Sequence, residues 1–236
     1  MHIAFLDANT DRSPLAARNP SEAEKFRALL QPHAPELVLH DFRATEGAFP
    51  EGLTGFDGIM VSGSPASVND DGAWIARLLD LIRTAVAQEL PVFGACFGHQ
   101  AVAQALGGMV GRNPQGWVLG RVQVPTLSPA PWMTGAPVSV GLHAAHNEQV
   151  LVPPPGAQVL GGTDATPHGH LALGTRVFST QYHPEITSAF MDELIEALED
   201  EIAPDAISRA RTSRADPLDS GLMAEWIAHF FAQARG

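Results

Sequence analysis

The segment that most constrains this chain is a short apolar run that leads into a cysteine flanked by glycines. Residues 90–95 read Leu-Pro-Val-Phe-Gly-Ala, which has the length and composition of a buried strand. After Cys96 come good helix formers, which end at a Gly-Gly pair at 107–108. Cys96 therefore lies at a strand-to-helix turn, where a side chain at Gly94 or Gly98 would crowd the neighbouring strand or helix. Such a turn predicts an α/β fold that presents the thiol at the carboxyl end of a strand.

Apolar runs and amphipathic segments alternate along much of the chain. We expect strands at 2–6, 36–40, 58–62, 91–95 and 176–181, and helices at 22–31, 73–89 and 97–106. Residues 110–174 change to short β-like pieces separated by Pro and Gly, which indicates an antiparallel extension. Helical patterns return at 191–202 and 222–234, on either side of a polar linker at 204–220. The sequence thus predicts an open, mostly parallel α/β sheet flanked by helices, with a small antiparallel extension and a helical C-terminal tail.

The size of the chain favours one main core. With 236 residues, 45% of them hydrophobic, the chain can bury a substantial core without disulfides or metals. We expect a catalytic domain over residues 1–190 and a helical extension over residues 191–236. Trp226, Phe230 and Phe231 give the last helix an apolar face that would be costly to expose. The extension is therefore expected to pack on the catalytic domain or on a partner.

Charge and cysteine content exclude several classes of protein. A formal net charge of −12 opposes binding to nucleic acid or to anionic lipid heads, so we expect neither nucleic acid nor a membrane as a partner. A single cysteine allows no intrachain disulfide and no zinc-binding cysteine cluster, as fits a reducing cytoplasm. No segment has the ~18 apolar residues that span a bilayer, and the N-terminus lacks the features of a secretory signal. His143, His146, His168 and His170 lack the spacing of a zinc motif, so we expect a cytoplasmic protein without a metal.

The surroundings of Cys96 indicate a nucleophile. The helix after Cys96 directs backbone N–H groups and a positive dipole end toward the sulfur, which favours the thiolate. A thiol nucleophile needs a base, and the base needs an acceptor that orients it. His183 and Glu185 follow the expected strand 176–181 and are separated by Pro184, so they can turn toward one another at the same edge of the sheet. A buried lone cysteine is more often inert packing, and a His-Pro-Glu tripeptide alone is weak evidence. The hypothesis rests on their combination.

Five segments carry a resemblance to a known family. They are Pro-Val-Phe-Gly-Ala-Cys-Phe-Gly-His-Gln at 91–100, Gln-Tyr-His-Pro-Glu at 181–185, Ser-Gly-Ser-Pro-Ala-Ser-Val at 62–68, Asn-Pro-Gln-Gly-Trp at 113–117 and Ala-His-Asn-Glu-Gln-Val at 145–150. In their order along the chain, which is 62–68, 91–100, 113–117, 145–150 and 181–185, they resemble the motifs of class I (triad) glutamine amidotransferases, and in particular the amidotransferase domain of GMP synthases. Ser64 stands where the family has a second glycine, and Glu148 stands where it has aspartate.

The resemblance implies a flavodoxin-like sheet, a mechanism and a set of site residues. Cys96 would attack the side-chain amide of glutamine, His183 would pass the proton to the leaving ammonia, and Glu185 would orient the imidazole. A glutamyl thioester would form and be hydrolysed by water. The backbone N–H groups of Gly63, Ser64 and Phe97 would hold the oxyanion, Gln100 and His146 would contact the substrate, and neither a cofactor nor a metal is needed.

Three functions remain open on the sequence. The first is a glutamine amidotransferase that passes ammonia to a separate synthetase subunit, because no synthetase domain follows the triad. The second is a γ-glutamyl hydrolase, in which water is the acceptor and the substrate is a γ-glutamyl amine or peptide. The third is a regulatory or binding protein that keeps the scaffold and does not use the triad. Release of ammonia from glutamine, cleavage of γ-glutamyl amines and labelling of Cys96 by an electrophile distinguish them.

Overall fold

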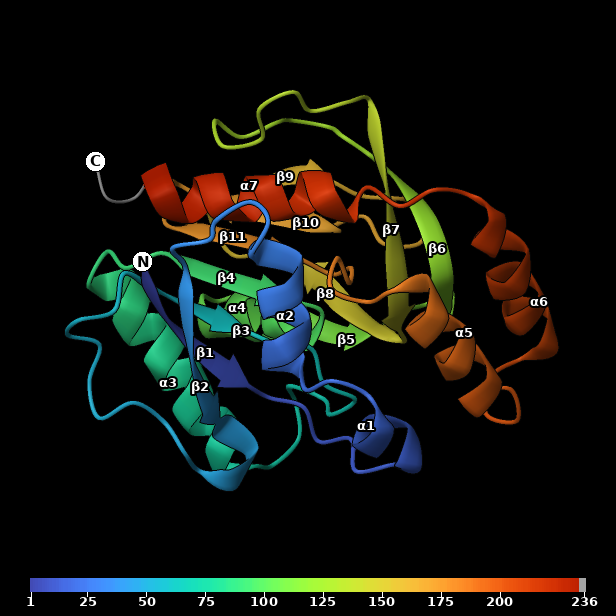
Figure 1. The fold of residues 1–236 in the computed structure, drawn as a ribbon, viewed down its shortest axis with the longest axis horizontal. Coiled ribbons are helices and arrows are strands. Elements are labelled where there is room, and N and C mark those ends of the chain that lie inside the picture. The colour runs from blue at the N-terminus through green and yellow to red at the C-terminus, as the bar shows by residue number, and fades with distance from the viewer. Residues whose placement is uncertain (234–236) are drawn as a thin grey trace.

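The centre of the molecule is a seven-stranded sheet that carries Cys96 near its middle (Figure 1). The computed structural model describes residues 1–233. The strand order is β2-β1-β3-β4-β11-β10-β9. The first five of these strands are parallel, and β10 and β9 complete the sheet in antiparallel fashion. The strands are β1 (His2–Asp7), β2 (Val38–Arg43), β3 (Gly58–Val61), β4 (Val92–Ala95), β9 (Gln158–Gly161), β10 (His170–Leu173) and β11 (Val177–Thr180). The predicted mostly parallel α/β sheet is confirmed.

Helices cover both faces of this sheet (Figure 1). One face packs against α2 (Glu22–Leu30) and α7 (Ser220–Gln233) in a cluster that includes Phe26, Phe93 and Phe178. The other face packs against α3 (Ala73–Ala87) and α4 (Phe97–Ala105) in a second cluster. The predicted cap of α2 is present, because Ser21 and Glu24 form a reciprocal capping box. The helices on the two faces hold the ends of the strands, and hence the site, in place.

The antiparallel extension consists of two separate two-stranded sheets. In one, β5 (Met109–Arg112) pairs with β8 (Glu148–Val152), and in the other β6 (Val118–Pro125) pairs with β7 (Ser139–His146). The ribbon of β6 and β7 stands beside the main sheet on the side of α5 and α6 (Figure 1). An isolated antiparallel bridge between His143 and His183 joins this ribbon to the segment that follows β11.

The C-terminal region differs from the expectation at one point. Residues 204–220 were expected to be a polar linker, and this is wrong, because they contain α6 (Pro204–Thr212) and the 3-10 turn η2 (Ser213–Ala215). Pro204 stands in the first turn of α6, and Ile207 and Ala210 are buried against β6 and against α5 (Ser188–Ala197). With so few apolar residues among polar ones, the periodic pattern is too sparse to be recognised. Two further elements, α1 (Pro14–Arg18) and η1 (Ala44–Glu46), were also not expected.

The last helix lies on the main core. Trp226, Phe230 and Phe231 of α7 are fully buried, and the ring of Phe230 contacts the rings of Trp132, Phe178 and Phe231. Their apolar face is thus covered by the chain itself. None of the helices described over residues 1–233 is long and apolar enough to cross a membrane.

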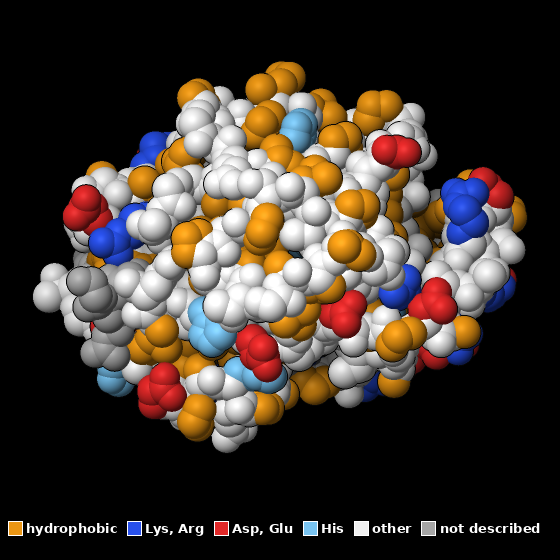
Figure 2. All heavy atoms as spheres, turned by 90° about the horizontal axis from the view of Figure 1, so that it is seen from above, with side chains coloured by type: hydrophobic (Ala, Val, Ile, Leu, Met, Phe, Trp, Pro, Cys, Tyr) orange, Lys and Arg blue, Asp and Glu red, His pale blue; other side chains and the backbone are white. Residues whose placement is uncertain are grey.

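Figure 2 looks onto the face that carries the loop between β6 and β7, which lies at the top of Figure 1. Hydrophobic side chains are dispersed over this face, and Leu127 and Val138 of the loop are exposed. Acidic and basic side chains lie together on the lobe at the right, where α6 lies, and others lie at the left and lower edges of this view. Within α6, Arg209 pairs with Asp205.

Candidate active site

The turn at Cys96 has the strained geometry that its sequence predicts. Cys96 has φ 50° and ψ −105°, and within residues 1–233 only Glu89 shares a positive φ among non-glycine residues. A Cβ on Gly94 would overlap the carbonyl of Gly98, and a Cβ on Gly98 would overlap the carbonyl of Val61. Both glycines are therefore needed, because β4, α4 and β3 pack against one another with backbone atoms in close contact. The strained turn lifts the cysteine out of the strand, and its backbone N–H bonds the carbonyl of Thr180 at 2.8 Å.

Backbone donors lie on the strand-end loop beside Cys96. Gly63 follows β3, and its Cα faces both Cys96 and His183: a Cβ there would lie 3.6 Å from the Cβ of Cys96 and 3.0 Å from the imidazole. In the described part of the chain, the backbone N–H groups of Gly63 and Phe97 donate to no protein acceptor. Ser64 adopts a negative φ, so the serine fits this loop without backbone strain. Its hydroxyl accepts from the N–H of Ala66, which braces the loop.

His183 and Glu185 form a buried pair next to the thiol. The Nδ1 atom of His183 lies 2.6 Å from Oε1 of Glu185, and the Glu185 side chain is inaccessible to solvent. Burial alone would lower the pKa of His183, but the charges of Cys96 and Glu185, together with hydrogen bonds to both, raise this pKa well above 6.5. The protonated form of the His183 imidazole is thus favoured.

The remaining predicted residues, Gln100 and His146, both contact the backbone carbonyl of Glu148. The Nε2 atom of Gln100 donates to the carbonyl of Glu148 at 2.9 Å and to Oε1 of Gln181 at 3.2 Å. His146 is buried, and its Nδ1 lies 3.0 Å from the same Glu148 carbonyl. Burial lowers the pKa of His146 to about 4, so its imidazole is neutral. Glu148 itself turns away and accepts from Ser67 at 2.7 Å. Gln100 and His146 therefore converge on one backbone segment.

Other histidines lie in the interior. His99 is fully buried with Nδ1 2.8 Å from the hydroxyl of Ser179, and burial lowers its pKa to about 3. His170 is also buried and packs edge-on against Tyr182. Within residues 1–233 no three His, Cys, Asp or Glu side chains are grouped so that they could hold a metal ion.

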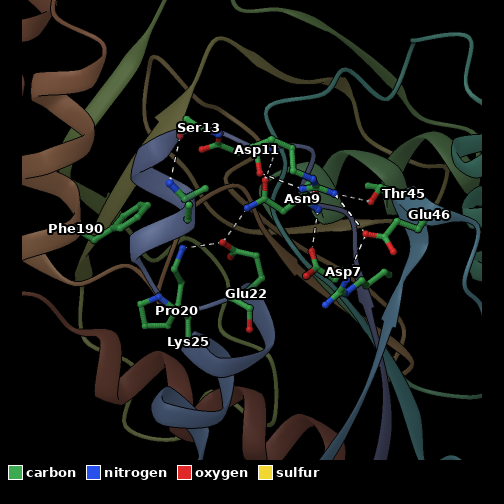
Figure 3. A pocket seen from close by; sticks show the side chains of 15 residues that line it. Asp7, Asn9, Asp11, Ser13, Pro20, Glu22, Lys25, Thr45, Glu46 and Phe190 are labelled. Atoms are coloured by element: carbon green, nitrogen blue, oxygen red, sulfur yellow. Dashed lines mark hydrogen bonds and ion pairs between the residues drawn. The ribbon is translucent and has the colours of Figure 1, made fainter.

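A polar pocket of about 320 Å³ lies at the carboxyl ends of β1 and β2 (Figure 3). Glu22 forms its buried wall, and the carboxylate accepts from Lys25 at 2.7 Å and from Asn9 at 3.2 Å. Burial raises the pKa of Glu22, Lys25 opposes the rise, and the negative charge of Glu185 adds to it. The charge of Glu185 thus acts on the carboxylate at the buried wall of this pocket.

Sequence reasoning missed two polar residues that interact with members of the proposed triad. Gln181 places its Nε2 3.7 Å from the sulfur of Cys96, and Glu22 lies near Glu185. Gln181 immediately precedes Tyr182 and His183 in the quoted motif, so its position was a signal that could have been used. Glu22 gave no signal, because an acidic residue in the first turn of a helix is common on helix-dipole grounds alone.

The fold and the site together define an α/β protein with a cysteine at its central strand-to-helix turn and a buried His–Glu pair beside it. The family model for glutamine amidotransferase class-I matches residues 29–199. The chain belongs to this family.

Several relatives are similar over much of the chain. Gamma-glutamyl peptidase 3 of Arabidopsis thaliana is 28% identical over 189 residues, which is 74% of this chain and 76% of the relative. A glutamine amidotransferase-like protein of Schizosaccharomyces pombe is 24% identical over 98% of this chain and 99% of its own length. GMP synthase of Aeropyrum pernix is 35% identical over 139 residues, but these make up 59% of this chain and only 26% of that enzyme.

Solved structures share the architecture. A glutamine amidotransferase from Methylobacillus flagellatus aligns over 99% of this chain and 93% of its own with a TM-score of 0.75 and 23% identity. One from Thermotoga maritima aligns over 98% of this chain and 97% of its own with a TM-score of 0.74 and 17% identity. At these identities the likeness concerns the fold.

Proposed function

We propose that this protein hydrolyses a γ-glutamyl amide through Cys96, His183 and Glu185. The observation that carries the proposal is the buried ion pair of His183 and Glu185 beside the cysteine, with a histidine pKa raised by the charge of each neighbour. A thiolate and an imidazolium held in this order are the starting state for attack on an amide carbonyl. Glu185 keeps Nδ1 occupied, so Nε2 is left for the reaction.

The reaction runs in two balanced steps. The thiolate of Cys96 adds to the amide carbon, the carbon–nitrogen bond breaks, and the proton of His183 goes to the leaving amine. Water then adds to the thioester while His183 takes its proton, and glutamate and the thiol are released. The unpartnered N–H groups of Gly63 and Phe97 are placed to receive the oxyanion, with Ser64 in the same loop. Gln100 and His146 are the proposed contacts to the glutamyl half.

Glutamine is the first candidate substrate. The family comprises glutamine amidotransferases, and GMP synthase is among the relatives. That match covers 26% of the enzyme, and with glutamine as substrate we propose that a synthetase subunit accepts the ammonia. Ammonia released into water would be protonated, and the acceptor could then no longer use it.

A γ-glutamyl peptide is the second candidate. It is favoured by the relatives named gamma-glutamyl peptidases, four of which match about two thirds or more of this chain at 27–30% identity. The same triad serves both substrates, and only the leaving group differs.

Steady-state assays with glutamine and with γ-glutamyl amines test the proposal. We expect release of glutamate from at least one of them by the wild-type protein, and loss of at least about 10³-fold in kcat for Cys96→Ala. Full activity in Cys96→Ala would show that the nucleophile is misassigned. Ammonia release from glutamine alone would select the first candidate, and faster release of a larger amine would select the second.

A further inference from the structure

A second pocket lies beside the His–Glu pair, between the β6–β7 ribbon and the C-terminal helices. Its volume is about 380 Å³, and its lining includes His143 of β7, Asp192 of α5 and Arg211, Arg214 and Asp216 from the segment of α6 and η2. The polar sequence of this segment had predicted a linker. Apart from His143, the lining thus comes from the part of the chain that follows the triad.

His143 links this pocket to the catalytic histidine. The backbone N–H of His183 donates to the carbonyl of His143 at 2.8 Å, and the two residues form an antiparallel bridge. Residues paired in this way project their side chains to the same face, with Cβ atoms about 5 Å apart. The charges of His183 and Glu185 both act on the imidazole of His143. The pocket and the proton donor therefore lie on one face of the ribbon.

The imidazole of His143 is buried without hydrogen-bond partners. His143 is 3% exposed, and neither of its ring nitrogens has a partner among the described residues. Burial, followed by the charge of His183, lowers its pKa to about 4. At neutral pH the ring thus offers one donor and one acceptor. Buried polar groups are rarely left unpaired, so an imidazole in this state at the wall of a pocket points to a polar ligand.

The side chains around the pocket carry both positive and negative charges, and its arginines have N–H donors that make no ion pair. Arg214 pairs with Asp192, and Arg211 pairs with Glu199 at 2.7 Å, in each case through one terminal nitrogen. A guanidinium has five N–H donors, so both arginines keep donors for a further carboxylate. In the pocket at Glu22, by contrast, the buried ammonium of Lys25 is already held by the buried carboxylate (Figure 3).

We propose that the pocket at His143 receives the leaving half of the substrate, and that this half is an amino acid or peptide whose carboxylate binds Arg214. The inference rests on the proposed function, because the leaving nitrogen must lie within reach of His183 to take its proton. The part attached to that nitrogen then extends along the face that His183 shares with His143. The substrate class is therefore γ-glutamyl amino acids and peptides.

The test compares two amides that differ by one carboxylate. We expect the wild-type kcat/KM for γ-glutamylglycine to exceed that for γ-glutamylethylamide by at least about tenfold. In Arg214→Gln and in His143→Phe this ratio should fall toward one. Arg209→Gln is the matched control, because Arg209 pairs with Asp205 on the same helix and does not line the pocket. Arg214 is half-exposed, so its variant folds even if the buried His143→Phe does not.

Two outcomes overturn the inference alone. One is equal hydrolysis of both amides by the wild-type protein. The other is a kcat/KM ratio of the two amides that is lost in Lys25→Met and kept in Arg214→Gln. This second outcome would place the leaving half in the pocket at Glu22. Failure to hydrolyse either amide or glutamine would instead overturn the proposed function, and this inference with it.

Discussion

Nδ1 of His183 lies 2.6 Å from Oε1 of Glu185, in a site where the carboxylate has no access to solvent. The pair sits at the end of β11, next to the strand that carries Cys96. A carboxylate in such a place fixes the imidazole and supports its positive charge.

Glu185→Gln should lower kcat by about 10²-fold or more, because the amide keeps the size of the side chain but not the charge that stabilises the imidazolium. Glutamate release under saturating substrate measures the effect. Glu193→Gln removes an exposed carboxylate that pairs with Arg18, and it should retain wild-type kcat. A Glu185→Gln variant as active as this control would remove Glu185 from the mechanism.

The pH profile should report the raised pKa of His183. His183 must carry a proton to protonate the leaving amine, so kcat should fall as the pH rises through a value well above 6.5. Glu185→Gln removes one of the charges that raise this pKa, and the basic limb should move to lower pH. Steady-state kcat between pH 5 and 10 checks both. A basic limb that stays in place in the variant would contradict the electrostatic role of Glu185.

Gly98→Ala should abolish activity and destabilise the fold by about 3 kcal/mol, because its Cβ would overlap a backbone carbonyl of β3 that cannot move freely. Urea denaturation gives the free energy of unfolding. Gly52→Ala is the control: a Cβ there meets nothing within 4 Å, and the change should stay within about 0.5 kcal/mol. Equal stability of the two variants would show that α4 does not need this close passage.

His170→Phe should make the protein less sensitive to acid. Burial lowers the pKa of His170 to about 3, so between pH 6.5 and that value the unfolded chain binds a proton that the folded chain does not. The contribution of neutral, buried His170 to the free energy of unfolding is present in full above pH 6.5. It falls by about 1.4 kcal/mol for each pH unit below that value. Between pH 6.5 and 5 the variant should therefore lose about 2 kcal/mol less than the wild type. A His170→Phe variant that loses as much stability as the wild type over this range would refute the argument.

The sequence predicted the elements on which the site is built. The strand before Cys96 and the helix after it have strong local signals, and their register follows from the glycines that permit close contact. The same holds for β1 and β3, whose apolar runs are continuous because both faces of the sheet are buried.

What the sequence did not predict depends on long-range pairing or on sparse patterns. The bridge between His143 and His183 joins residues 40 positions apart and has no local signature. Helix α6 has only three buried residues, so its polar composition resembled a linker until β6 and α5 gave it a surface to cover. The neighbourhood of Glu22 and Glu185 likewise exists only after α2 has packed on the sheet.

Covalent labelling of the cysteine tests the central claim most directly. The protein has one cysteine, so an adduct of a glutamine-mimicking diazo-ketone can be assigned by intact mass and peptide mapping. We predict one adduct per chain on Cys96, slowed by glutamine or a γ-glutamyl amide and strongly reduced in His183→Asn. An unlabelled wild-type protein under reducing conditions, or labelling that ignores His183 and substrate, would contradict a thiol activated by the His–Glu pair.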